Sequence, residues 1–153
     1  MEWFNAFGLV FLVAIMIPNI IFALKQSDAF ENKYRNKAAI IIEQIGRYGC
    51  IGFMIFNIPT TEPLWWPGEM LIAYLIVDTI LVLIYWLIWI LCRNKNNTFR
   101  ALSLSIIPSV LFLFSGIMCR SLPLIISSLI FMPSHILISY KNACKEFNIT
   151  DIS

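Results

Sequence analysis

The chain contains five apolar runs, each long enough to cross a lipid bilayer as an α-helix. The hydrocarbon core is about 30 Å thick, so a helix needs about 20 mainly apolar residues to span it. The runs occupy residues 3–24, 38–58, 69–92, 101–119 and 122–140. Only 13% of the residues are charged, against about 25% in an average soluble domain. The sequence therefore predicts an all-α, polytopic membrane protein. Residues 1–153 would form one bundle of five transmembrane helices, with 141–153 as a short tail.

Lysine and arginine lie almost entirely on one side of the five predicted helices. Nine of them fall within 25–37, 93–100 and the tail, whereas the other side carries only Arg120. Cytoplasmic loops of membrane proteins carry an excess of Lys and Arg. We therefore expect the N-terminus outside and the C-terminus, with its tail, in the cytoplasm. The frequent use of Ile, Asn and Lys is typical of AT-rich bacterial genomes, so the expected location is a bacterial cytoplasmic membrane.

Two charged residues, Glu43 and Arg47, lie within the otherwise apolar run 38–58. On insertion scales each charge near the bilayer centre costs about 2.5–3.5 kcal/mol, whereas a large apolar residue contributes only about 0.3–0.6 kcal/mol. The cost of the two charges nearly cancels the summed contribution of about ten large apolar residues in this run. The helix therefore needs polar partners inside a bundle. Ionisable residues within transmembrane segments usually mark a functional site.

Polar residues of several predicted helices fall at similar depths in the membrane. A rise of about 1.5 Å per residue places Arg47 level with Asp78, and His135 level with Glu43. Ser105 and Ser109 arrive near the same level. We therefore expect a ligand-binding site in the bundle interior, formed by Asn19, Glu43, Gln44, Arg47, Asp78 and His135.

Four of these residues also have a purely structural interpretation. Glu43 and Arg47 are four residues apart, so they can pair on the surface of their own helix. Asp78 can serve only to neutralise Arg47. His135 can donate to a backbone carbonyl that Pro133 leaves without its helical partner. The sequence leaves both interpretations open.

Glycines and prolines predict where helices approach closely or bend. Gly46, Gly49 and Gly52 leave one side of the second helix thin, so a neighbouring helix is expected to pack tightly against it. Prolines interrupt three predicted helices, each followed by a small polar residue: Pro18, Pro108 and Pro133. Such a proline leaves one carbonyl of the preceding turn without its hydrogen bond.

Common catalytic and cofactor motifs are absent from the sequence. It contains no GxSxG, HExxH, P-loop or dinucleotide-binding glycine pattern. With one histidine and no CxxC pair, we expect no metal and no cofactor. The basic residues flank the membrane, so we expect no nucleic acid partner. The helix count and length are similar to those of the translocator-protein class of small membrane proteins. The tryptophan-rich motifs of that class are missing, so no residue is assigned from it.

The leading hypothesis is an integral membrane protein that binds or transports a small polar or amphipathic solute through a cytoplasm-facing cavity. Its expected partners are membrane lipids, the small-molecule ligand, and a second copy of the chain or a partner membrane protein. One alternative is a membrane-embedded enzyme acting on a lipid or isoprenoid, with His135 and Glu43 as an acid–base pair. A second alternative is an accessory subunit of a larger complex, whose charges meet those of a partner helix. It predicts that the protein purified alone is unstable, or that Arg47 has no partner within the chain. No nucleophile can be identified, so the question of enzyme activity stays open.

Overall fold

The computed structural model describes residues 4–25, 36–56, 68–92 and 98–150, which form five α-helices. Their bounds are α1 (Ala6–Lys25), α2 (Lys37–Ile55), α3 (Gly68–Leu91), α4 (Thr98–Met118) and α5 (Leu122–Thr150). The all-α prediction is confirmed. Helices α2 to α5 are long and apolar enough to cross a membrane, and α1 contains a shorter apolar stretch, Ala6–Phe22. Most of the basic segments between α1 and α2 and between α3 and α4, residues 26–35 and 93–97, lie outside the described residues.

Helix α5 is longer than the predicted segment 122–140, because it continues to Thr150. The prediction ended the segment where apolar residues give way to polar ones. Residues 141–150 contain neither glycine nor proline, so nothing in their backbone chemistry interrupts the helix. Loss of hydrophobicity therefore marks the end of the apolar span rather than the end of the helix.

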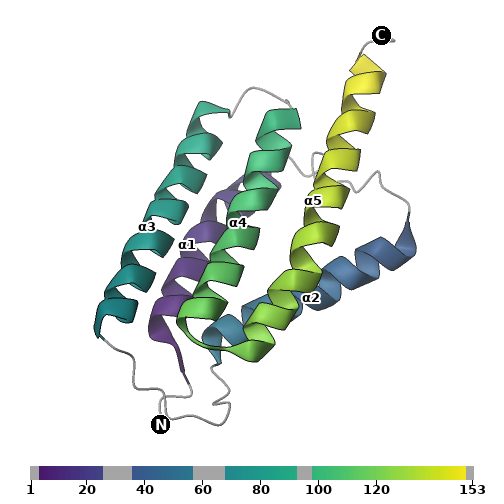
Figure 1. Ribbon diagram of the computed structural model, residues 1–153. Helices are drawn as coiled ribbons and strands as arrows, with labels where there is room; N and C mark the ends of the chain where they lie inside the picture. The colour runs from purple at the N-terminus through teal and green to yellow at the C-terminus, as the bar shows by residue number, and fades with distance from the viewer. Residues whose placement is uncertain (1–3, 26–35, 57–67, 93–97, 151–153) are drawn as a thin grey trace.

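The helices form a bundle in which α2 is inclined to the others. Figure 1 shows α1, α3 and α4 side by side, with α5 beside α4 and α2 crossing the start of α5. Helix α4 packs mainly on α5 and α3, whereas α2 packs mainly on α5. Helices α1 and α3 finish at the same end of the molecule at which α4 begins. The long α5 finishes beyond that end, and α1 begins at the opposite end.

The start of α1 is fixed to the end of α2. The Asn5 backbone N–H donates to the Ile55 carbonyl at 2.8 Å, and the Asn5 side chain caps α1 by accepting from the Gly8 N–H at 3.0 Å. Gly8 lies so close to the Met54 carbonyl that a side chain at this position would overlap it. The two helices therefore meet tightly at the end of the molecule that carries the N-terminus.

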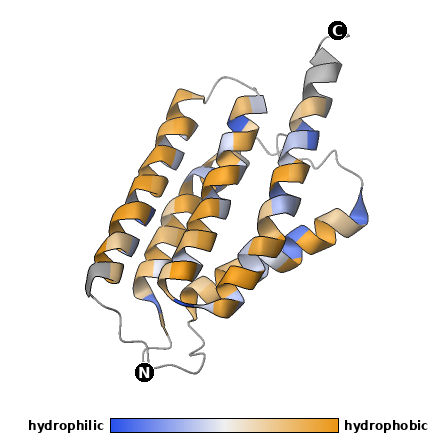
Figure 2. Ribbon diagram, viewed as in Figure 1, coloured by the Kyte–Doolittle hydropathy of each residue, from blue (hydrophilic) through white to orange (hydrophobic). Residues whose placement is uncertain are grey.

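Large apolar side chains cover the outside of the bundle, and small polar ones fill much of its interior. Figure 2 shows hydrophobic residues along most of the length of the helices, and many of the large ones are exposed. On α3, for example, Ile76, Leu83 and Leu87 are exposed. The serines Ser109, Ser115 and Ser128 are fully buried. A soluble protein rarely exposes an apolar surface of this extent, whereas small residues at helix contacts are typical of membrane bundles.

Glycines bring α2 and α5 into close contact. A Cβ added at Gly46 would lie 2.7 Å from the Phe131 backbone nitrogen, and one at Gly49 would lie 2.5 Å from the Ser127 Oγ. At Gly52 an added Cβ meets no atom within 4 Å. The predicted close approach is thus confirmed at Gly46 and Gly49, with α5 as the partner helix. It is wrong at Gly52.

Candidate functional site

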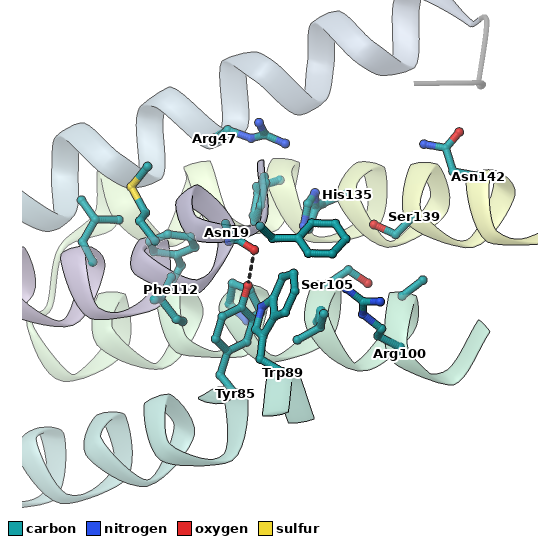
Figure 3. Close-up of a pocket in the computed structure, with 18 of the residues that line it drawn as sticks. Asn19, Arg47, Tyr85, Trp89, Arg100, Ser105, Phe112, His135, Ser139 and Asn142 are labelled. Atoms are coloured by element: carbon teal, nitrogen blue, oxygen red, sulfur yellow. Dashed lines mark hydrogen bonds between the residues drawn. The ribbon is translucent and has the colours of Figure 1, made fainter. Parts of the chain in front are cut away.

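A cavity of about 450 Å³ lies between the helices, and all five contribute to its wall. Its volume falls within the range of about 300–1,000 Å³ that small-molecule sites occupy. The polar lining residues are Asn19, Arg47, Tyr85, Arg100, Ser105, His135, Ser139 and Asn142 (Figure 3). The larger apolar ones are Leu12, Ile15, Phe22, Ile51, Trp89, Phe112 and Phe131.

Polarity changes along the length of this cavity. On α4, Arg100 lies in the first turn and Phe112 lies twelve residues further on, about 18 Å along the helix axis. On α5, Asn142 and Ser139 lie towards the same end as Arg100, and Phe131 lies deeper. The cavity is therefore more polar towards the end where α4 begins, and we call this end the mouth; it is more apolar towards the middle of the bundle, and we call this end the floor.

Arg100 lies at the mouth against a pair of aromatic rings, Phe22 and Trp89, whose centres are 4.9 Å apart. Its guanidinium carbon lies 4.8 Å from the centre of the Phe22 ring and 4.8 Å from that of the Trp89 ring. The residue is only 7% exposed. Stacking of a planar guanidinium on aromatic faces is favourable and restricts its motion. From the sequence, Arg100 was grouped with the basic residues flanking the membrane. The one sign of its burial in the sequence is that it directly precedes the apolar run 101–119.

Glu43 joins α2 to α5. Its Oε1 forms an ion pair with Arg47 on the same helix and lies 3.0 Å from the His135 Nδ1 of α5. Glu43 is only 3% exposed, so its carboxylate is shielded behind the cavity wall. The His135 ring stacks on Phe131, with ring centres 4.5 Å apart. Pairing of Glu43 and Arg47 on one helix, one of the two interpretations left open above, is present. The prediction that Glu43 and His135 lie at the same depth agrees with their contact.

Asn19 contributes a polar group to the cavity wall from the second half of α1. Its Oδ1 accepts a hydrogen bond of 2.8 Å from the Tyr85 hydroxyl of α3 (Figure 3). Pro18 lies within α1 directly before it, as predicted. The bond joins α1 to α3 at the level of Arg47 and Trp89 in the cavity.

The predicted pairing of Arg47 with Asp78 is wrong. Asp78 is fully buried, its Oδ2 accepts a hydrogen bond of 2.6 Å from the Ser115 hydroxyl of α4, and it is absent from the cavity lining. Arg47 instead pairs with Glu43. The reason is that α2 packs against α5, α1 and α4, whereas α3 packs against α4 and α1. Equal depth in the membrane does not make two helices neighbours.

Asp78 belongs to a second buried polar cluster, between the starts of α1 and α3 and the end of α4. Tyr74 and Asp78 are four residues apart on α3, and so are Ser115 of α4 and Cys119, which directly follows α4. The Asn5 amide lies 3.4 Å from the Tyr74 hydroxyl and 3.7 Å from the Cys119 sulfur. This cluster lies towards the opposite end of the bundle from the cavity mouth.

Three of the six predicted site residues thus line the cavity, namely Asn19, Arg47 and His135. Glu43 supports two of them from behind. Gln44 and Asp78 do not line it. Arg47 forms an ion pair with Glu43, so an Arg47 without a partner, one of the two alternatives that the accessory-subunit hypothesis predicted, is not observed.

The apolar exterior and the helix lengths are those of a multi-pass helical membrane protein, and a cavity lined by both apolar and polar side chains lies between its helices. No family model, curated protein or solved structure matches the chain. Any functional proposal must therefore rest on the geometry and chemistry of the cavity.

Proposed function

We propose that the protein binds a small amphipathic solute in this cavity, as a carrier or a transporter in a cell membrane. The observation that supports it is the joining of a polar mouth to an apolar floor within a cavity of about 450 Å³. Sites for small molecules are typically concave and mainly apolar, with a few polar groups that orient the ligand. A solute with one polar and one apolar end matches that arrangement better than a uniformly polar one.

The mouth would face the cytoplasm of a bacterial cell. Arg100 lies in the first turn of α4 and Lys141 in the later part of α5, after the lining residue Ser139. In the sequence, the basic segment 25–37 follows α1 and the basic segment 93–100 follows α3, and both of these helices finish at the end where α4 begins. Because positive residues gather on the cytoplasmic side, this orientation places the N-terminus outside and the C-terminus inside.

Filling the mouth with a large side chain is expected to weaken binding of the solute strongly. Ser139→Trp places a large side chain on the cavity wall of α5, and ligand affinity should fall by about tenfold or more because the solute and the indole compete for one volume. Leu137→Trp introduces the same side chain two residues away, on the exposed face of the same helix. This variant should bind the solute as wild type does. Thermal-shift screening of amphipathic solutes in lipid nanodiscs measures both.

Two results would count against the proposal. One is that no solute stabilises the wild-type protein. The other is that the Ser139→Trp and Leu137→Trp variants respond alike to every solute that stabilises the wild type. In the second case the solute binds outside the cavity.

A second candidate function is acid–base catalysis on a lipid or isoprenoid, favoured by the Glu43–His135 pair. A carboxylate 3.0 Å from one nitrogen of a histidine orients the ring and fixes its tautomer, as in many catalytic sites. The His135 side chain is 21% exposed and lines the cavity. Lipid extracts from cells expressing wild type should then differ in one lipid species from those expressing His135→Ala. Identical extracts from both, with both proteins folded, would remove this candidate.

A further inference from the structure

We propose that Asp78 is a proton-binding site in the interior of the bundle, whose carboxyl group takes up and releases a proton at its Oδ1 atom. This inference goes beyond the proposed function and does not depend on it. It is carried by the complete burial of Asp78, by the unequal hydrogen bonding of its two carboxyl oxygens, and by the charges of the described residues that face it.

The two carboxyl oxygens of Asp78 have different surroundings. Oδ2 accepts a hydrogen bond of 2.6 Å from the Ser115 hydroxyl of α4. Oδ1 is buried and has no hydrogen-bond partner. Buried polar atoms of native proteins nearly always have a partner, so an exception requires an explanation. Oδ1 is thus the oxygen left for a proton, which needs no cavity because it adds almost no volume.

No cation of the described residues lies beside Asp78. Helix α3, which carries Asp78, packs on α4 and α1. The charged residue of α4 is Arg100, which lies fifteen residues before Ser115, about 22 Å along the helix axis. The charged residue of α1 is Lys25, the last residue of that helix, whereas α1 meets the Asp78 cluster through Asn5 just before its start.

The other titratable groups that face Asp78 bring no positive charge. Tyr74 lies one turn before Asp78 on α3, and Cys119 lies one turn after Ser115. Their hydroxyl and thiol are neutral with their protons and anionic without them. The Asn5 amide, 3.4 Å from the Tyr74 hydroxyl and 3.7 Å from the Cys119 sulfur, is neutral. An ionised Asp78 would therefore be an unpaired charge among neutral groups.

Glu43 shows what a buried carboxylate of this chain needs in order to stay ionised. It is 3% exposed, pairs with Arg47, and lies 3.0 Å from the His135 Nδ1. Asp78 is 0% exposed and has only the Ser115 hydroxyl. Burying an unpaired charge costs several kcal/mol, and the usual outcome is that the group becomes neutral instead. Carboxyl groups inside membrane bundles commonly serve in proton relays.

The proton-transfer step is balanced without a further reactant. A hydronium ion gives its proton to the Oδ1 of the Asp78 carboxylate, an O–H bond forms, and a water molecule is released. Release of the proton is the reverse. The Ser115 hydroxyl keeps donating to Oδ2 in both states, so it holds the carboxyl group in place while the charge changes.

The test is infrared spectroscopy of the full-length protein in lipid membranes, because a protonated carboxylic acid and a carboxylate have separate carbonyl stretching bands. Labelling the aspartate carboxyl carbons with carbon-13 shifts only the bands of Asp28, Asp78 and Asp151, the aspartates of this chain. We expect a label-sensitive band of a protonated acid at neutral pH. The band should disappear when the pH is made alkaline and return when neutral pH is restored.

Matched variants assign the band to one residue. Asp78→Asn should lose it completely, and the variant should fold because a neutral amide of the same shape replaces a neutral acid and still accepts from Ser115. Asp28→Asn and Asp151→Asn make the same change at the other two aspartates and should keep the band. The double variant of Asp28→Asn and Asp151→Asn leaves Asp78 as the last aspartate, so it decides the assignment even if Asp78→Asn does not fold.

Three results would overturn the proposal. The first is a double variant with no label-sensitive acid band at neutral pH, which means that Asp78 is ionised. The second is a band that survives in folded Asp78→Asn. The third is a band that stays unchanged at alkaline pH while the protein remains folded, since a proton that is never released is not a bound ligand. No solute enters these measurements, and Asp78 does not line the cavity, so each of these results leaves the proposed function standing.

Discussion

Replacing Gly46 with alanine is expected to lower the free energy of unfolding by about 1–3 kcal/mol, because it overpacks the contact between α2 and α5. The added Cβ would lie 2.7 Å from the Phe131 backbone nitrogen and 2.8 Å from its Cα. Backbone atoms cannot rotate away as a side-chain end can, so one helix must shift. Gly46→Val should be more damaging still. Unfolding midpoints in mild detergent measure both changes.

Gly52→Ala is the matched control for this effect, since it makes the same change on the same helix with no atom within 4 Å. Alanine is a better helix former than glycine by about 1 kcal/mol, so this variant should be as stable as wild type or slightly more stable. Gly49→Ala should fall between the two, because it meets the movable Ser127 side chain at 2.5 Å. Equal midpoints for Gly46→Ala and Gly52→Ala would contradict the α2–α5 packing described here.

Removing the Glu43 carboxylate is the second change with a large expected effect. Glu43→Ala takes away the shared acceptor of Arg47 and His135 and leaves a cation in an apolar region. Breaking a fully buried ion pair costs about 3–5 kcal/mol. The Arg47 side chain is 42% exposed, so we expect about 1–3 kcal/mol, a value discounted for screening. Chemical unfolding in detergent is the measurement.

A double-mutant cycle separates the ion pair from general damage to α2. Adding Arg47→Leu to Glu43→Ala should recover much of the lost stability, because the uncompensated charge is then gone. Gln44→Ala, next in the chain and outside the cavity lining, should change stability by no more than about 0.5 kcal/mol. If Glu43→Ala and Gln44→Ala are equally mild, Glu43 does not join α2 to α5.

Much of the fold could be predicted from the sequence, because a bilayer imposes simple rules on a chain. Apolar runs about 20 residues long predicted five helices, and five are present. Glycine spacing predicted a close helix contact, found at Gly46 and Gly49. The end of α5 was misplaced by ten residues, since hydrophobicity reports on the apolar span and not on where helical hydrogen bonding stops.

The candidate site was predicted less well, because depth along a helix says nothing about which helices pack together. Glu43 and His135 were placed at one level, and they do meet across the α2–α5 contact. Arg47 and Asp78 were placed at one level by the same reasoning, and they belong to different polar groups. Arg100 was missed because an arginine at a helix end resembles an ordinary residue at the membrane surface. Its burial depends on Phe22 and Trp89, which come from two other helices.

The proposed opening of the cavity to water at the cytoplasmic side can be tested most directly by labelling introduced cysteines. Ser139→Cys places a thiol on the cavity wall, and Leu137→Cys places one on the exposed apolar face of the same helix. A charged methanethiosulfonate reagent needs water to reach either thiol, and intact mass counts the labels added beyond those of wild type. We predict rapid labelling of Ser139→Cys from the cytoplasmic side of membrane vesicles, with Leu137→Cys inert. Inert behaviour of both variants, or labelling of Ser139→Cys only from the outer side, would contradict a cavity open to the cytoplasm.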